Sequence, residues 1–258
     1  MKSIVITGVD GSGKTSFLDK LEESSINARF VRVPKIEVDQ YEGDLKKVGL
    51  FINKMGEKSD ELKSPTLKII SIFSSMLFFE DFYAFQQSHS PKVIFCERHP
   101  LIDTAVYGLI YMEYLNQSSA LTNDLEIGEE EGHVFEKIAQ KVNRNLGVDQ
   151  IKNANGLLLF LKDWFSDAEN FKVKQLSKLF NIALPDEVYF LNAPTEVLYQ
   201  RISSRSNKEV HETKVAMERM KGLYTKVLED AQINFKSLDT SDWEPTRQLV
   251  DSFTERFG

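Results

Sequence analysis

The chain has 258 residues, 41% of them hydrophobic and 28% charged, proportions that are ordinary for a globular protein in water. Its formal net charge of −7 argues against a general affinity for nucleic acid polymers, which needs basic surface, but does not exclude a small basic cleft for a nucleotide. With one cysteine, no visible signal peptide and no apolar run of about 20 residues, a cytoplasmic protein without disulfides or a membrane span is expected.

Five short apolar segments are predicted strands, and helical patterns lie between them. Strands that alternate with helices form a mostly parallel sheet through right-handed crossovers. The sequence therefore predicts an α/β fold with a five-stranded parallel sheet flanked by helices. Ligands of such sheets bind beyond the carboxyl ends of the strands. The predicted strands are Ser3–Thr7, Arg29–Val33, Lys92–Cys96, Glu187–Asn192 and Ile233–Leu238.

The first predicted strand is followed by Gly8-Val9-Asp10-Gly11-Ser12-Gly13-Lys14-Thr15, which fits the pattern G-x-x-x-x-G-K-[ST]. A helical pattern comes next, and strand, glycine loop and helix in this order are typical of a phosphate site. Glycines let backbone N–H groups converge on an anion, and the helix adds the positive end of its dipole. Lys14 is expected to reach the β- and γ-phosphates, and the Thr15 hydroxyl to ligate Mg²⁺.

The second and third predicted strands also end in charged residues. Arg32, two residues before Pro34, is a candidate for holding a second phosphate, and a surface arginine is the alternative. Glu97 is a candidate for orienting the waters of Mg²⁺, and Arg98 for neutralising charge on a transferred phosphate. The alternative for this pair is a salt bridge at a loop entrance. His99 is expected to be structural, or a stacking partner for a ring.

Two long regions lie between these strands. Residues 63–86 predict a long helix with a break, whose broad apolar face fits either the core or a subunit interface. Residues of about 112–183 predict a helical insertion. Within it, 116–119 and 127–132 have loop composition, and 156–165 is an apolar helix.

The last part of the chain adds a candidate lid. Thr195 marks the N-cap region of a helix that ends in basic and small residues, and a lid of about residues 201–212 would exclude water from a phosphoryl transfer. An ordinary basic helix end is the alternative. The loop Asp239-Thr240-Ser241-Asp242 follows the fifth predicted strand, either at the depth of a nucleotide base or as a plain turn.

Taken in order, these sites resemble the thymidylate kinase family of P-loop nucleoside monophosphate kinases. The glycine loop with its acidic Asp10, Arg32-Val33-Pro34 and Glu97-Arg98-His99 are similar to the family's glycine loop, its Arg-x-Pro motif and its Asp-Arg-Tyr/His motif. Residues 184–191, 201–205 and 218–224 resemble its fourth strand, its lid and the helix after the lid. The resemblance covers most of the chain except about 112–183.

The resemblance implies a single P-loop NTPase domain over residues 1–258 that moves the γ-phosphoryl group of Mg-ATP to a nucleoside monophosphate. The implied catalytic residues are Lys14, Arg98, Asp10 and Arg205, with Lys208 as a further lid cation, and the implied metal site is Thr15 with Glu97. ATP would be held by Gly8, Gly11, Ser12, Gly13, Lys14, Thr15, Ser16 and Arg201. The acceptor would contact Asp10, Arg32, Pro34, Phe78, Phe82, Arg98, Asp103 and Tyr107. The resemblance also implies a homodimer.

The positions that would read the acceptor base depart from that family. Phe82 stands near the place of an arginine that reads thymine, and Asp103 is suited to accept from an exocyclic amino group, which thymine lacks. Glu97-Arg98 followed by Asp103 also resembles the motif of deoxyribonucleoside kinases, although Arg32 fits a phosphorylated acceptor better than a free nucleoside. A kinase for a nucleoside or another small acceptor, and a nucleotide-binding protein with little turnover, therefore stay open.

Overall fold

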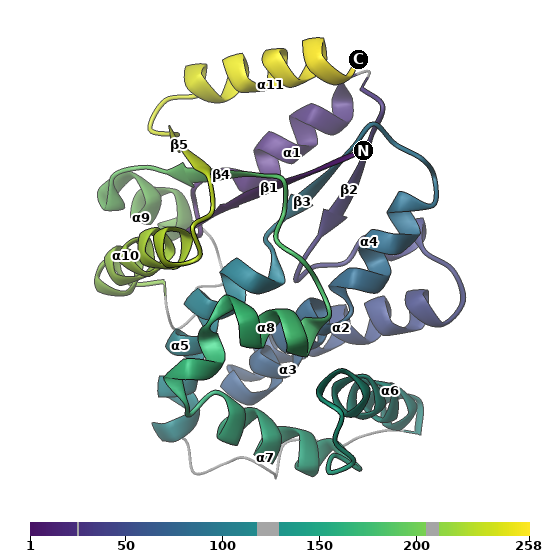
Figure 1. Cartoon of the computed structure of the whole chain (residues 1–258). Coiled ribbons are helices and arrows are strands. Elements are labelled where there is room, and N and C mark those ends of the chain that lie inside the picture. Colours follow the sequence, from purple (N-terminus) through teal and green to yellow (C-terminus); the bar gives the residue numbers. More distant parts are fainter. Residues whose placement is uncertain (25, 118–128, 205–211) are drawn as a thin grey trace. The chain divides into compact units, whose positions relative to one another are not determined.

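The computed structural model describes residues 1–24, 26–117, 129–204 and 212–258, without the side chains of 111–117, 129 and 130. The chain divides into two compact units (Figure 1). Residues 1–32, 83–106 and 184–258 form what we call the sheet unit, and residues 33–82 and 107–183 form the helical unit.

The sheet unit is built on five parallel strands in the order β2-β3-β1-β4-β5. The predicted α/β fold with a five-stranded parallel sheet is confirmed, and the strand ends shift by no more than two residues. Because all strands run the same way, their carboxyl ends meet at one edge of the sheet. The strands are β1 (Lys2–Gly8), β2 (Ala28–Arg32), β3 (Val93–Glu97), β4 (Glu187–Asn192) and β5 (Phe235–Asp239).

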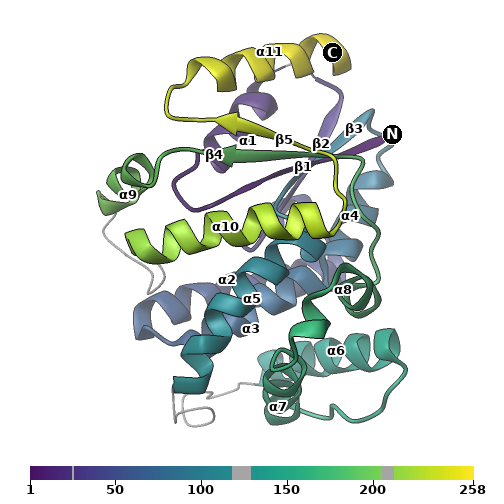
Figure 2. The same cartoon turned by 60° about the vertical axis from the view of Figure 1, so that its left-hand side comes forward.

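Helices cover both faces of this sheet (Figure 2). On one face lie α1 (Lys14–Glu23) and α11 (Glu244–Phe257), whose Phe17 and Phe253 rings pack 6.2 Å apart. Phe253 also packs on Phe95 of β3, at 5.1 Å. On the other face lies α10 (Lys214–Asp230), whose Tyr224 ring is 5.3 Å from that of Phe190 in β4. The shorter α9 (Thr195–Ser203) follows β4.

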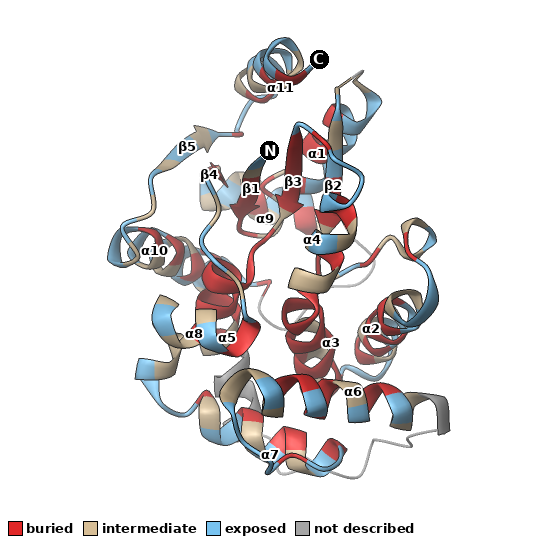
Figure 3. Ribbon diagram, turned by 45° about the vertical axis from the view of Figure 1, so that its right-hand side comes forward, coloured by how far each residue is buried: buried red, intermediate tan, exposed pale blue. Residues whose placement is uncertain are grey.

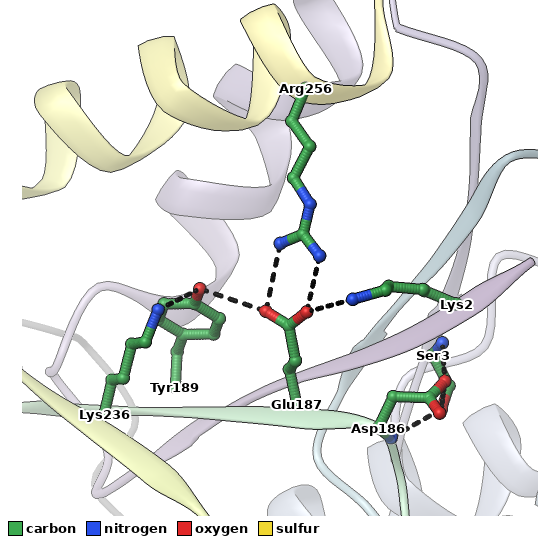
Figure 4. A network of polar contacts seen from close by, with 7 residues as sticks. All are labelled: Lys2, Ser3, Asp186, Glu187, Tyr189, Lys236 and Arg256. Atoms are coloured by element: carbon green, nitrogen blue, oxygen red, sulfur yellow. Dashed lines mark hydrogen bonds and ion pairs between the residues drawn. The ribbon is translucent and has the colours of Figure 1, made fainter.

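A polar network fastens α11 to the amino-terminal edge of the sheet (Figure 4). The Glu187 carboxylate, at the start of β4, accepts from Lys2 at 2.8 Å and from both terminal nitrogens of Arg256, at 2.6 and 3.1 Å. Hydrogen bonds from Arg256 and Lys2 lower the pKa of Glu187 to about 2. This network lies at the amino-terminal edge of the sheet, whereas the loop after β1 lies at the carboxyl edge. The network therefore stabilises the fold and is not part of a site at the carboxyl edge.

The helical unit contains α2 (Gly43–Leu62), α3 (Pro65–Leu77) and, from the predicted insertion, α6 (Glu129–Leu146), α7 (Ala154–Trp164) and α8 (Val173–Phe180). Helices α4 (Phe79–Gln87) and α5 (Pro100–Gln117) each contain residues of both units. The 3₁₀ turns are Val38–Gln40 and Ala168–Phe171. The Phe73 ring of α3 packs near Phe165 and Phe180, at 6.4 and 6.0 Å, which joins α3 to the segment of α7 and α8.

The structure settles several details of the helical prediction. The long helix predicted over 63–86 is two helices, α3 and α4, separated by a break at Phe78. The N-cap residue of α3 is Ser64, whose hydroxyl accepts from the Leu67 N–H at 3.4 Å. Figure 3 shows α3 buried over most of its surface, which favours the core over a subunit interface for this helix. The homodimer stays a prediction.

The predicted loops were wrong where the structure describes them: residues 129–132 form the first turn of α6, and residues 116–117 belong to α5. Residues 118–119 and 127–128 lie outside the described residues. A helix does begin at Thr195, but its N-cap residue is Pro194, and the Thr195 hydroxyl bonds to Glu218 and does not cap the helix. No helix among the described residues is long and apolar enough to cross a membrane.

Candidate phosphate-binding site

The glycine loop connects β1 to α1 at the carboxyl edge of the sheet. Gly8 has φ +147°, and a Cβ there would lie 2.2 Å from the Leu191 carbonyl oxygen of β4. Gly11 has φ +82°, and its Cβ would lie 2.9 Å from the Leu198 carbonyl oxygen of α9. Both positions therefore require glycine for space as well as for backbone conformation. Because α1 begins at Lys14, the positive end of its dipole lies at the end of the loop.

Lys14 is folded back onto this loop. Its ammonium donates to the carbonyl oxygens of Gly8 at 2.9 Å and Val9 at 3.1 Å, and it lies 3.9 Å from the Asp10 carboxylate. Only 4% of the residue is exposed. Burial, followed by the charge of Arg98, lowers the pKa of Lys14 from 10.5 to about 8. The loop thus holds a buried cation whose charge is weakly compensated, which is suited to attract a phosphate.

Arg98 directly follows β3 and faces the same loop. One terminal nitrogen of its guanidinium donates to the Asp10 carboxylate at 2.7 Å. Its backbone is in the left-handed region, with φ +70°, and its N–H donates to the Ile6 carbonyl oxygen at 3.1 Å. A non-glycine residue in this conformation is strained by about 1–3 kcal/mol, and such strain is concentrated at functional sites. The structure therefore brings Arg98, Asp10 and Lys14 together.

Thr15 and Glu97 also meet, since the Thr15 hydroxyl donates to the Glu97 carboxylate at 3.1 Å. Hydroxyl and carboxylate oxygens are hard ligands that suit Mg²⁺, which keeps several waters and takes few protein ligands. No group of three or more His, Cys, Asp or Glu residues with metal-binding geometry occurs in the described part of the chain. The pair therefore fits a magnesium ion that is shared with substrate phosphates, but not a closed structural metal site.

His99, expected to be structural or a stacking partner for a ring, makes a structural contact. It directly precedes α5, and its Nδ1 accepts from the Leu101 N–H at 3.3 Å. Burial lowers its pKa to about 3, so the ring stays neutral and its Nδ1 stays an acceptor. The Cys96 thiol is buried as well, which raises its pKa and makes it a poor nucleophile.

Asp103 lies in the first turn of α5 and is fully buried. Its Oδ1 accepts from the Thr7 hydroxyl at 2.9 Å and from the Tyr224 hydroxyl at 2.6 Å, and its Oδ2 accepts from the His99 N–H at 2.7 Å. A contact between Asp103 and an acceptor base stays a prediction, and in this structure the carboxylate has other partners. The sequence does not single out Thr7 or Tyr224, because nothing in the segments that contain them shows that their hydroxyls bond to Asp103.

Arg32 lies at the end of β2, where its guanidinium contacts α1. It donates to Asp19 at 2.6 Å and to Glu22 at 2.8 Å, and 9% of its side chain is exposed. Its role in binding a phosphate stays a prediction. To bind one, the guanidinium would have to exchange at least one of these two carboxylates for the phosphate.

Arg201 of α9 joins the glycine loop to the loop after β5. Its terminal nitrogens donate to the Gly11 carbonyl oxygen at 3.3 Å and to the Thr240 carbonyl oxygen at 2.6 Å. The polar segment 239–242 is thus held near the phosphate loop. Arg205 and Lys208, the other lid cations, lie outside the described residues.

The remaining predicted contacts to the acceptor belong to the helical unit. Pro34 follows a cis peptide bond. The Lys141 ammonium lies over the Phe78 ring, 5.3 Å from its centroid, and the ring centroids of Phe82 and Tyr41 are 4.8 Å apart. Phe82 and Tyr107 are buried. Their contact with a base stays a prediction.

No protein-family model matches the chain, and no curated protein matches its sequence. Among solved structures, it is similar to deoxyadenosine kinase from M. mycoides, determined with the products dCMP and a flexible dCDP, at 14% identity and a TM-score of 0.48. That match covers 99% of this chain and 100% of the other. It is also similar to thymidylate kinase from Candida albicans, at 16% identity and a TM-score of 0.49, over 99% of this chain and 92% of the other.

Proposed function

We propose that the protein is a P-loop phosphotransferase that moves the γ-phosphoryl group of ATP to a nucleoside monophosphate. The observation that carries the proposal is the contact of Arg98 with the glycine loop, through the 2.7 Å bond to Asp10. A glycine loop alone is suited to bind a triphosphate. Here a second cation, the nearly buried guanidinium of Arg98, lies opposite that loop. It is suited to stabilise the negative charge that develops on a phosphoryl group during transfer.

The donor side uses residues that the loop already holds together. Backbone N–H groups of the loop and the start of α1 would bind the phosphate oxygens, and Lys14 would exchange its bonds with the Gly8 and Val9 carbonyls for the β- and γ-phosphates. Thr15 and Glu97 would hold the magnesium ion, directly or through water. When bound, Mg²⁺ neutralises charge on the β- and γ-phosphates.

On the acceptor side, Arg98 would leave Asp10 for the moving phosphoryl group, and Arg32 would hold the acceptor's own phosphate. Asp10 would then accept a hydrogen bond from a sugar hydroxyl of the acceptor. Arg32 is bonded to two carboxylates in this structure, so the acceptor's phosphate would have to displace at least one of them.

The lid would supply the rest of the charge stabilisation. Since Gly11 stands where a loop arginine is found in some thymidylate kinases, cations from 201–212 would have to replace it. Arg201 already reaches the loop through the Gly11 carbonyl. Arg205 and Lys208 would complete this set and exclude water from the transfer.

The test is an acceptor panel with ATP and Mg²⁺, in which ADP release and the phosphorylated product are both measured. We expect ADP that depends on a nucleoside monophosphate, together with the matching diphosphate. Product from nucleosides alone would instead support a nucleoside kinase. ATP binding without ADP from any acceptor would support a nucleotide-binding protein with little turnover.

A further inference from the structure

The Asp103 carboxylate is an ionisable group with no exposed surface, and such a group is costly unless the protein compensates it. Here it accepts three hydrogen bonds, from Thr7 of β1, from Tyr224 of α10 and from the His99 N–H of its own turn. The other terminal nitrogen of Arg98 lies 3.6 Å from Asp103 Oδ1, within ion-pair range. Asp103 is thus a buried anion placed against the arginine that faces the glycine loop.

These contacts continue into the loop without a gap. Tyr224 contacts Asp103, Asp103 contacts Arg98, Arg98 contacts Asp10, and Asp10 lies 3.9 Å from Lys14. All five side chains belong to the sheet unit. The two carboxylates on Arg98 differ in exposure: the Asp10 side chain is 19% exposed, while that of Asp103 is 0% exposed.

We propose that Asp103 is a positioning residue for Arg98, and that Tyr224 acts through it. This inference rests on the proposed phosphoryl transfer. Asp103 keeps one end of the guanidinium fixed while the other end moves from the partly exposed Asp10 to the phosphoryl group. The Tyr224 and Thr7 hydroxyls fix the carboxylate itself, so Arg98 keeps its strained turn and its direction toward the loop.

A double-mutant cycle in turnover tests whether Tyr224 acts through Arg98. Tyr224→Phe removes one hydroxyl and keeps the packed ring, so we expect kcat to fall about 10-fold with little change in the KM for ATP. In the Arg98→Ala background, the same change is expected to leave kcat unaltered. An equal fall in both backgrounds would overturn the proposal.

The matched control is Tyr189→Phe. Tyr189 is 4% exposed in β4, and its hydroxyl donates to the Glu187 carboxylate at 3.3 Å, at the far edge of the sheet. This variant loses the same group from another buried ring in the same unit, so we expect kcat within about twofold of the unaltered protein. A fall as large as that of Tyr224→Phe would show a general effect of the lost hydroxyl and overturn the proposal.

A second readout does not need turnover. In NMR spectra, the Arg98 guanidinium N–H signals, assigned by their loss in Arg98→Ala, report whether both ends of the group are held. We expect separate signals in the unaltered protein and in Tyr189→Phe, and averaged signals in Asp103→Asn and Tyr224→Phe. Unaltered signals in both of the latter variants would overturn this inference, whereas an inactive acceptor panel would overturn only the proposed function.

Discussion

Asp10 and Arg98 are 88 residues apart in sequence, and their carboxylate and guanidinium are 2.7 Å apart in the structure. The pair joins the loop after β1 to the turn after β3. It also sets a condition on function, because a phosphate that binds Arg98 has to compete with Asp10. A substrate phosphate that binds Arg98 would therefore rearrange the charges of the site.

Lys14→Ala should lower kcat/KM by at least about 10²-fold, because charge stabilisation at the transferred phosphoryl group is lost. Lys14→Arg keeps the charge but not the fit to the Gly8 and Val9 carbonyls. We expect it to bind ATP more tightly than Lys14→Ala, which equilibrium titration with a fluorescent ATP analogue measures. Near-normal turnover of Lys14→Ala would remove this residue from the mechanism.

ATP binding should take up a proton at alkaline pH. The pKa of Lys14 is about 8 in the free protein, and bound phosphates raise it. As the pH rises through 8 the free side chain loses its proton while the bound one keeps it, so binding takes up a growing fraction of a proton above pH 8. Titration calorimetry in two buffers of different ionisation enthalpy measures this fraction. Lys14→Arg, whose side chain stays charged, should lack this uptake.

Arg98→Ala should lower kcat by about 10²-fold or more, with a smaller effect on ATP affinity, because the guanidinium acts on the transferred group. Arg256→Ala is a suitable control, since it removes an arginine from a carboxylate of the same unit, at the other edge of the sheet. It should leave kcat unaltered. Equal losses in both variants would indicate a general effect on folding.

Glu187 should make stability depend on acid pH. Its pKa is lowered to about 2 in the folded protein from 4.5, so its contribution is present above pH 4.5 and is lost as the pH falls toward 2. Glu187→Gln should lower the free energy of unfolding by about 1 kcal/mol at pH 7, and by less at pH 3. Urea unfolding at the two pH values measures this difference. An equal loss of unfolding free energy at both pH values would show that the charge of the Glu187 carboxylate does not contribute to stability.

Gly8→Ala should be far more damaging than Gly13→Ala. Both glycines have positive φ, but a Cβ at Gly8 would meet the Leu191 carbonyl of the neighbouring strand, whereas a Cβ at Gly13 has nothing within 4 Å. We expect a loss of at least about 3 kcal/mol in unfolding free energy for the first and about 1 kcal/mol for the second. Similar losses in the two variants would show that the positive φ, and not the contact with the Leu191 carbonyl, determines the loss of stability.

The sequence predicted well those features that depend on neighbouring residues. The strands and the glycine loop follow from local sequence patterns. The position of Arg98 directly after β3, at the same edge of the sheet as the glycine loop, follows from the parallel arrangement of the strands. Contacts between distant segments were not predictable in this way. Tyr224 reaches Asp103 across 121 residues, and a tyrosine within a helix gives no sign of its partner. For the same reason, the motif suggested a base contact for Asp103, while its burial became visible only with the fold.

In the proposed phosphotransferase, the glycine loop and Arg98 bind two substrates close enough together for phosphoryl transfer. The most direct test of this claim is the affinity for bisubstrate analogues, in which adenosine and a second nucleoside are joined by five phosphates. We expect the best analogue to bind at least about 10²-fold more tightly than ATP, and Arg98→Ala to lose that excess. An analogue series that binds no more tightly than ATP, with or without Arg98, would contradict the claim.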